Sequence, residues 1–528
     1  MANLKILDVT LRDGGCVNNF NFGLEYMNNI LNALELSNVD YIELGYLDSK
    51  NGSLDNRTQF KNEKCIYQNF LLEKKKNTKY VAMIDYGKFP IDQLEPCNSK
   101  SIDGIRLCFH KKDRFNIIET CKRIIELGYE CFVQPMLTLR YSKEELIELI
   151  DLININIPNI KALYIVDSFG EMRETELKDI FYLFEKHLSN NIAIGFHSHN
   201  NLQLSYSNAI ALINFPTIHN IMVDSSIMGM GKGAGNLNTE LLLEHINLLG
   251  ESKYKITPLL NIIDTVIKPL HNEYRWGYSV EYYLSSINHC TPSYASHFYN
   301  KHMLPINKIN DLLSLIREEK KISFDKDYAE EIYRQYNESQ SFDDHETLEY
   351  LYSLINNKDV IIIGPGKSIN THSNDIISLS KNKIIISLNF IPNFINPDLI
   401  FITRHDLFSK CQNDKTVVAS NLSTSNKLVI EYKKWIEKDF ENIYDSSAVF
   451  ALKIACFCKA KSIYLAGLDG FTSNINENYF NKNLRRGLSE EQSNKRNDFY
   501  YRFIKKLENE VSIKFITPSL YNKEKKYD

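Results

Sequence analysis

Two histidines stand two positions apart where an apolar run gives way to a polar loop. His197 and His199 follow the apolar segment 192–196 and precede two asparagines. Side chains two apart on an extended strand point to the same side, so both imidazoles can face one ion. Taken alone, such a pair is as readily two unrelated surface histidines. A metal site therefore needs a third ligand.

Asp13 supplies this third ligand. It lies in the segment TLRDGG at 10–15, directly after the first β-branched run of the chain. Two imidazoles and one carboxylate leave coordination positions open for substrate and water, and they suit Mn²⁺, Mg²⁺, Co²⁺ or Zn²⁺. We predict that Asp13, His197 and His199 bind a divalent metal ion.

Arg12, next to Asp13, indicates what the metal is used for. An enolate that forms beside a metal needs a second cation, and a guanidinium is permanently charged. The two glycines that follow open access to the backbone, which makes an ordinary surface salt bridge the weaker interpretation. Glu43 ends a second apolar run. We expect it to orient Arg12 or a metal-bound water, and the alternative is a simple ion pair with a neighbouring cation.

A glycine-rich loop follows Asp224. Residues 229–236 read GMGKGAGN. Such a loop can wrap a ligand or present backbone N–H groups, although glycine-rich turns are common without ligands. Asn236, at its end, is a candidate to bind the substrate, to bind the metal, or to support a metal ligand.

Eight β-branched segments alternate with helical patterns, and the polar residues above lie at their ends. The segments are 4–8, 41–45, 80–85, 104–108, 130–135, 162–167, 192–197 and 220–224. Strand–helix alternation predicts parallel strands. Eight such units over ~250 residues are the size of a (β/α)8 barrel, whose active site lies at the C-terminal ends of the strands.

The rest of the chain changes character twice. Residues from about 306 to 354 are charged and helix-patterned, and a new strand–helix pattern starts at Asp359. We expect its strands at 360–363, 384–388, 399–403, 416–419 and 462–466. The predicted fold is thus α/β, in three parts. They are an N-terminal (β/α)8 TIM barrel at 1–305, a helical appendage and connector at 306–355, and a C-terminal Rossmann-like α/β domain with an open doubly wound sheet at 356–528.

Composition excludes several classes of protein. The chain has 528 residues, too many for one hydrophobic core. Its net charge of −4 provides no basic surface for nucleic acid. No apolar run reaches the ~20 residues of a membrane helix, and the ten cysteines form no C-x-x-C pair. We expect a cytoplasmic protein with reduced thiols, without a secretory leader and without nucleic-acid or membrane partners.

Five motifs of the barrel region together resemble those of the DRE-TIM metallolyases, the HMGL-like superfamily. They are TLRDGG at 10–15, IE at 42–43, VDS at 166–168, GFHSHNN at 195–201 and DSSIMGMGKGAGN at 224–236. Within the superfamily, the last motif is most similar to that of the 4-hydroxy-2-oxovalerate, or pyruvate, aldolases. The resemblance implies Mn²⁺ on the three predicted ligands, a pyruvate enolate stabilised by Arg12, and pyruvate held by Ser168. It also implies a late tyrosine that lines the site, for which Tyr294 is the candidate.

The sequence departs from the superfamily at two places. The aldolases carry a catalytic histidine three residues after the metal aspartate, where this chain has Cys16. A thiol can move a proton, but with a pKa near 8.5 it matches the task less well, so the aldehyde or its chemistry differs. The CoA lyases use a catalytic cysteine in the glycine-rich loop, and residues 229–236 contain none. Acyl-CoA lysis is therefore disfavoured.

The C-terminal region opens with the segment GPGKS at 364–368, directly after a predicted strand. A Walker A motif would need glycine at position 361, where isoleucine stands. The loop can still hold a phosphate at a helix N-terminus. The candidate residues for a phosphate or nucleotide are Gly364, Gly366, Lys367, Ser368, Asn389 and Asp469. The pattern loosely resembles the Rossmann-like domains of bacterial sialyltransferases and pterin-pyrophosphokinase-like proteins. A purely structural turn is an equal alternative.

The leading functional hypothesis is a metal-dependent aldolase that joins a 2-oxoacid enolate to an aldehyde, or cleaves the product. Paired with a domain for a nucleotide or nucleotide-sugar, it predicts a bifunctional, homo-oligomeric enzyme of surface-carbohydrate synthesis. The second hypothesis is a Claisen-type acyltransferase, like isopropylmalate synthase, that joins acetyl-CoA to a 2-oxoacid. The third is a catalytically inactive barrel that serves as a scaffold, supported only by Cys16.

Overall fold

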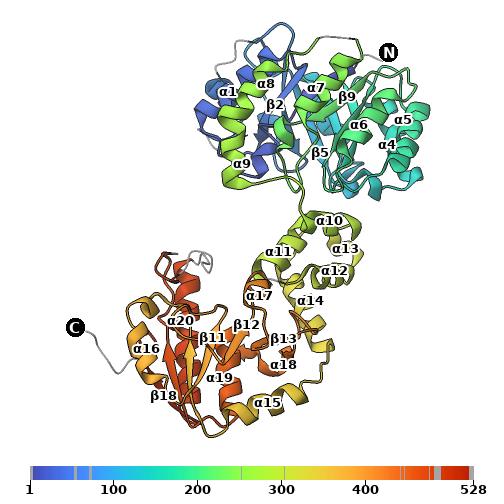
Figure 1. Cartoon of the computed structure of the whole chain (residues 1–528). Coiled ribbons are helices and arrows are strands. Elements are labelled where there is room, and N and C mark those ends of the chain that lie inside the picture. Colours follow the sequence, from blue (N-terminus) through green and yellow to red (C-terminus); the bar gives the residue numbers. More distant parts are fainter. Residues whose placement is uncertain are drawn as a thin grey trace. The chain divides into compact units, whose positions relative to one another are not determined.

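The computed structural model describes most of the chain as two compact units. The described residues are 4–52, 56–70, 74–250, 253–302, 304–439, 442–444, 446–474, 476–480 and 489–522. The first unit comprises Met1–Ser296 with Arg317–Phe324, and the second comprises His297–Ile316 with Asp325–Asp528 (Figure 1).

Within the described part of the first unit, eight parallel strands close into a barrel. Hydrogen bonding follows the order β1-β9-β8-β7-β6-β5-β4-β2, and β2 pairs again with β1. The strands are β1 (Leu4–Asp8), β2 (Tyr41–Leu47), β4 (Lys79–Asp85), β5 (Gly104–Phe109), β6 (Glu130–Pro135), β7 (Ala162–Asp167), β8 (Ala193–Ser198) and β9 (Ile221–Ser225), and the short β3 (Gln59–Phe60) extends the sheet at β2. The predicted (β/α)8 barrel is confirmed.

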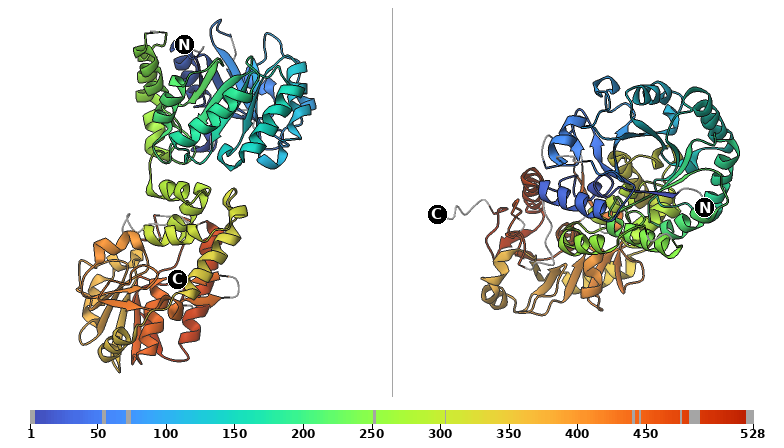
Figure 2. Two further views of the ribbon diagram at one scale, coloured as in Figure 1. Left: turned by 90° about the vertical axis from the view of Figure 1, so that its right-hand side faces the viewer. Right: turned by 90° about the horizontal axis from the view of Figure 1, so that it is seen from above.

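Helices connect the strands and pack around the barrel (Figure 2). They are α1 (Leu24–Leu36), α2 (Glu63–Phe70), α3 (Ile117–Glu126), α4 (Lys143–Asn156), α5 (Glu174–His187), α6 (Ser205–Asn214), α7 (Thr239–Leu248), α8 (Thr257–Ile262) and α9 (Lys268–Tyr274), followed by α10 (Val280–Ile287) and α11 (Pro292–His302). Helix α4 shows why such segments form helices. Ser142 and Glu145 make a reciprocal capping box at its start, and its buried apolar residues recur at helical spacing.

Side chains fill the interior of the barrel in close contact. The ring of Tyr164 on β7 lies against the backbone of Gly195 on β8, where a Cβ atom would come within 2.3 Å of the ring. Tyr164 is fully buried. The absence of a side chain at Gly195 therefore sets the spacing of β7 and β8 two residues before His197.

The second unit combines helices with an open parallel sheet. Its helices are α12 (Ile306–Ser314), α14 (Lys326–Ser339), α15 (His345–Ile355), α16 (Ser373–Leu379), α17 (His405–Cys411), α18 (Tyr432–Trp435), α19 (Ser447–Phe457) and α20 (Glu490–Leu507), whereas α13 (Glu318–Lys321) belongs to the first unit. The described strands follow the order β14-β13-β12-β11-β10-β17-β18. They are β10 (Asp359–Ile363), β11 (Ile384–Leu388), β12 (Leu399–Ile402), β13 (Thr416–Ala419), β14 (Leu428–Ile430), β17 (Ser462–Ala466) and β18 (Ser512–Phe515). The predicted α/β class is confirmed.

Three features of this unit were not predicted. They are the edge strands β14 and β18 and the antiparallel pair β15 (Glu437–Asp439) and β16 (Asn442–Tyr444). Each has only three or four residues, too few to show a reliable alternation of apolar and polar positions.

The order of the sheet reverses beside β10, which pairs with β11 on one side and β17 on the other. In open parallel sheets, ligands bind in the crevice at such a switch point, outside the carboxyl ends of the strands. The loops after β10 and β17 carry Ser368 and Asp469. Among the described residues, no helix is long and apolar enough to span a membrane.

The contact between Gly195 and Tyr164 gives a first prediction. Gly195→Ala should lower the stability of the barrel by about 1–3 kcal/mol, because the added methyl group overpacks the interior. Chemical denaturation followed by circular dichroism measures this as a lower midpoint for the barrel transition. An unchanged midpoint would show that the Tyr164 ring moves aside without cost.

Candidate metal centre

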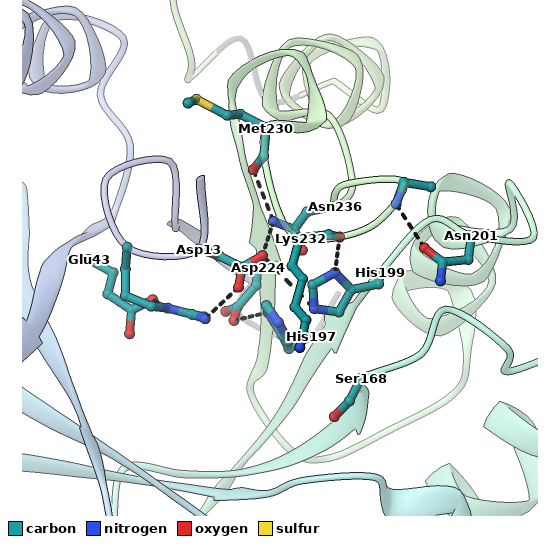
Figure 3. A network of polar contacts seen from close by, with 12 residues as sticks. Asp13, Glu43, Ser168, His197, His199, Asn201, Asp224, Met230, Lys232 and Asn236 are labelled. Carbon is teal, nitrogen blue, oxygen red and sulfur yellow. Dashed lines mark hydrogen bonds and ion pairs between the residues drawn. The ribbon is translucent and has the colours of Figure 1, made fainter. Parts of the chain in front are cut away.

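The structure brings Asp13, His197 and His199 together at the C-terminal end of the barrel strands (Figure 3). Asp13 lies in the turn after β1, and the histidines lie at and just beyond the end of β8. One ligand atom from each residue lies within 4.8 Å of the others. All three residues are buried. Ligands far apart in the sequence thus converge on one point.

Hydrogen bonds at Nδ1 determine which nitrogen of each imidazole faces this point. His197 Nδ1 lies 2.9 Å from Asp224 Oδ2, and His199 Nδ1 lies 3.1 Å from the carbonyl oxygen of Lys232. Because a carboxylate and a carbonyl only accept, each Nδ1 carries the proton. The Nε2 lone pairs remain available for a metal. Burial lowers the pKa of His199 to about 4, so this ligand is neutral at pH 7.

Asp13 is held as a carboxylate by two donors. Arg12 Nη1 donates to Oδ1 at 2.7 Å, and Asn236 Nδ2 donates to Oδ2 at 2.6 Å. Burial alone would raise the pKa of Asp13, but the charge of Arg12 and the hydrogen bond from Asn236 hold it well below the usual range. The carboxylate is therefore ionised and ready to bind a cation.

Behind the ligands, carboxylates and guanidiniums alternate in a buried chain. Its members, in order, are Asp13, Arg12, Glu43, Arg106 and Asp224, which bonds to His197. Arg12 Nε donates to Glu43 at 2.6 Å, and Arg106 Nη1 donates to the same oxygen at 2.8 Å. Glu43 and Arg106 are completely buried. Glu43 thus pairs with Arg12, a contact that fits both the orienting role and the simple ion pair expected for it.

Sequence reasoning missed Arg106 and assigned no role to Asp224. Arg106 lies in the middle of β5, whose six residues are all buried. An arginine inside an apolar strand was the available signal, because a buried charge requires a partner. The ring of Tyr164 covers its guanidinium, with Cζ 4.9 Å from the ring centroid.

Several buried polar atoms around the ligands have no hydrogen-bond partner among the described residues, and two of them belong to residues that bond directly to Asp13. These two are Nη2 of Arg12 and Oδ1 of Asn236. A buried unpaired group is costly unless a ligand satisfies it. Two imidazoles, one carboxylate and a nearby amide oxygen also match the donors that Mn²⁺, Co²⁺ and Zn²⁺ accept. The residues present therefore fit a divalent metal and an anionic ligand.

The other predicted residues of the barrel lie at different places. Ser168 directly follows β7, is half-buried, and accepts a hydrogen bond from the backbone N–H of Leu137 at 3.1 Å. Cys16 is solvent-exposed. Desolvation by the surrounding protein, and secondarily the negative charge of Asp13, raises the pKa of its thiol above the usual range. At neutral pH the thiol is protonated.

Tyr294 lies on α11 and is fully buried. Its hydroxyl donates to the carbonyl oxygen of Lys320 at 3.2 Å, and its ring packs edge-on against Phe324. These contacts join Tyr294 to segment 317–324. Its role at the metal centre stays a prediction.

The candidate loop of the second unit already contains an anion. Asp469 accepts from the backbone N–H of Ser368 at 2.8 Å and from its hydroxyl at 2.5 Å. Gly366 donates to the carbonyl of Gly467 at 2.8 Å, and a Cβ atom there would lie 2.5 Å from that oxygen. The structure thus joins the loops after β10 and β17. A phosphate would have to compete with Asp469 for these donors.

The remaining predicted residues of this loop differ in setting. Lys367 is exposed, and a Cβ atom on Gly364 would lie 2.5 Å from the carbonyl oxygen of Gly467. Asn389 accepts from the N–H of Thr403 at 3.0 Å and donates to the hydroxyl of Ser447 at 2.9 Å. The contacts of Asn389 are thus with other elements of the sheet and with α19. Phosphate or nucleotide binding by this set stays a prediction.

Comparison with known proteins identifies the family of the barrel. The model of the HMGL-like family matches residues 3–266, which is half of the chain. The chain belongs to the HMGL-like family. The predicted membership of this metallolyase superfamily is thus confirmed.

Individual HMGL-like relatives carry aldolase names. The 4-hydroxy-2-oxovalerate aldolase of Geobacillus thermodenitrificans is 26% identical over 269 residues, covering 51% of this chain and 77% of the relative. The 4-hydroxy-2-oxovalerate aldolase of Carboxydothermus hydrogenoformans is 28% identical over 267 residues, covering 50% of this chain and 77% of the relative. Among solved structures, the N-terminal domain of a Bacteroides vulgatus protein assigned as an aldolase is 27% identical, with a TM-score of 0.50. That match covers 56% of this chain and 97% of that domain.

The bond between Asp224 and His197 gives a second prediction. Asp224→Asn should weaken metal binding by about 10–100-fold, because the uncharged amide makes the imidazole a poorer ligand. Calorimetric titration of the metal-free protein with Mn²⁺ measures this. Asp85→Asn, at the end of β4, is the matched control, since that carboxylate accepts from the Cys108 thiol instead. Equal affinity in the Asp224 variant and the wild type would contradict the role of Asp224.

Arg106 gives a third prediction, for stability. Arg106→Met should destabilise the barrel by about 3–5 kcal/mol, because it leaves Glu43 and Asp224 buried with too little positive charge. Arg114→Met is the control. It removes a partly exposed pair with Glu148, and such surface pairs contribute at most about 1 kcal/mol. Chemical denaturation measures the free energy of unfolding of both variants. A similar decrease in both would show that the buried charged residues contribute no more to stability than a surface ion pair.

Proposed function

We propose that the protein is a divalent-metal-dependent aldolase that acts through the enolate of a 2-oxoacid, with pyruvate the first candidate. The observation that carries this proposal is the buried, unpartnered Nη2 of Arg12 next to the metal ligands. Family membership and the names of the relatives agree with it.

Arg12 is prepared to stabilise negative charge on a substrate oxygen. Glu43 holds its Nε and Asp13 holds its Nη1, so the guanidinium cannot turn away. The remaining Nη2 is free to donate to an oxyanion as charge develops. A donor fixed before the reaction needs no reorganisation, which is why such groups lower the barrier.

Asp13, His197 and His199 would hold the metal, for which we propose Mn²⁺. The ion would supply Lewis acidity to the bound 2-oxoacid. The residues around it leave Nε2 of each imidazole facing the ion, and they keep His199 neutral and Asp13 ionised, as metal binding needs. Asn236 adds an amide oxygen whose hydrogen-bonding capacity is unused.

Proton transfer to the aldehyde oxygen has no histidine at the position where the aldolases carry one. Cys16 stands there as a protonated thiol, which can donate a proton but is not a base at neutral pH. This difference supports an aldehyde unlike that of the named relatives. For the second unit we propose a nucleotide or nucleotide-sugar ligand. The position of the loop at 364–368 beside the switch point of the sheet supports this proposal.

Isotope exchange tests this function directly. In D₂O with Mn²⁺, the methyl protons of pyruvate should exchange, as followed by proton NMR. Arg12→Ala should slow the exchange by about 10²–10³-fold, as expected for loss of one oxyanion donor. His197→Ala should abolish it through loss of the metal.

Two outcomes separate the alternatives. Consumption of a 2-oxoacid that depends on acetyl-CoA and releases free CoA would favour the Claisen-type reaction. No exchange with any 2-oxoacid, in protein shown to hold its metal, would contradict enolate chemistry and favour a scaffold.

A further inference from the structure

A second group of imidazole and carboxylate ligands lies in the described part of the second unit. His297 and His302 come from the C-terminal half of α11, and Glu330 comes from α14. Their ligand atoms all lie within 4.8 Å of one another. None of these residues belongs to the barrel centre.

Both histidines direct the same nitrogen to the same carboxylate oxygen. Nε2 of His297 lies 2.6 Å from Oε1 of Glu330, and Nε2 of His302 lies 3.1 Å from it. The ring of His302 stacks on Tyr333 of α14 at a centroid distance of 3.7 Å. This stacking fixes the plane of the imidazole before any ion binds. Because a carboxylate only accepts, each Nε2 carries a proton in this arrangement, and a metal ion would take the place of that proton.

The cluster is open on the carboxylate side. The side chains of His297 and His302 are 12% and 9% exposed, whereas that of Glu330 is 32% exposed. An ion can therefore reach the cluster from solvent on the side of Glu330.

Lys301 argues for another interpretation, in which Glu330 is only the centre of an ion-pair network. Its Nζ lies 2.5 Å from Oε1 of Glu330, close to where a cation would bind. The Lys301 side chain is, however, 42% exposed and can extend into solvent. An ion pair with an exposed ammonium contributes little to stability, so displacing Lys301 costs little.

We propose that His297, His302 and Glu330 bind a transition-metal ion, with Zn²⁺ the best fit, and that this ion holds the end of α11 against α14. Two imidazole nitrogens and one carboxylate oxygen are ligands that Zn²⁺ takes at about 2.0–2.2 Å, with water in the fourth position. Mg²⁺ and Ca²⁺ prefer sites built of oxygen and fit less well.

The ion would stabilise a junction that continues into the sheet domain of the same unit. The hydroxyl of Tyr333 lies 3.1 Å from that of Tyr432 on α18. Fixing His302 and Glu330 on either side of Tyr333 therefore restrains α14 where it meets α18. Metal bound only by the folded state raises thermal stability by mass action.

Metal content of the full-length protein tests the site. Chelator-treated protein is saturated with Zn²⁺, dialysed and analysed by mass spectrometry of the elements. His302→Ala and His297→Ala should each hold one equivalent less than the wild type, and they should lose the rise in Tm that this equivalent provides. His345→Ala is the matched control, a 72% exposed histidine paired with Glu349, and it should retain the wild-type content.

Lys301→Met separates the two interpretations. If the cluster binds metal, removal of the ammonium should tighten Zn²⁺ binding and preserve the stoichiometry. If it is only an ion-pair network, Lys301→Met leaves Zn²⁺ binding unchanged and His302→Ala retains every equivalent, which would overturn the proposal.

The test does not depend on the barrel chemistry. His197→Ala should remove the barrel equivalent and leave the α11–α14 equivalent in place. If a His297 or His302 variant fails to fold, the site is tested instead in His197→Ala protein loaded with Co²⁺, in which the barrel site is disabled. Visible absorption of tetrahedral Co²⁺ that strengthens with Lys301→Met supports the site, and its absence from both proteins excludes it.

Discussion

The metal centre depends on the buried alternation of charge that runs through Glu43 and Arg106. A carboxylate or guanidinium moved out of water costs several kcal/mol unless it is paired and hydrogen-bonded. Within this buried series, three carboxylates alternate with two guanidiniums, which leaves one negative charge unbalanced. The carboxylates are those of Asp13, Glu43 and Asp224, and the guanidiniums are those of Arg12 and Arg106. Asp13 stands at one end of this series of charged residues, beside the imidazoles of His197 and His199. A divalent cation there would reverse the net charge and attract an anionic 2-oxoacid.

The same contacts position both halves of the proposed chemistry. Asp224 sets the tautomer of His197, and Glu43 sets the direction of Arg12, while Arg106 bonds to both carboxylates. A change at Arg106 therefore reaches the metal ligand and the oxyanion donor together. Cys16 is exposed and does not belong to this buried series of charged residues. The proton-transfer step is thus the part of the site that the buried chain leaves free to differ from the relatives.

The sequence predicted the strands and the convergence of Asp13, His197 and His199 because their signals are local. The apolar runs mark the strands, and strand ends converge in a parallel barrel, so Asp13 and His197 needed no knowledge of distant contacts. Arg106 differs, since its partners are 63 and 118 residues away. The roles of Ser168 and Tyr294 came from resemblance rather than from spacing. The short edge strands β14 and β18 depend on pairing with their neighbours rather than on their own composition.

Unsatisfied donors distinguish the barrel centre from the loop at the switch point of the second sheet. In the barrel, Arg12 beside Asp13 has a buried, unpaired Nη2, which favours an anion. In the loop after β10, the N–H and hydroxyl of Ser368 are already bonded to Asp469. An incoming phosphate would meet a carboxylate at close range, and two anions repel strongly where water is scarce. The barrel is therefore prepared for its substrate, whereas the loop would bind a nucleotide only if Asp469 turned away or a cation bridged the two.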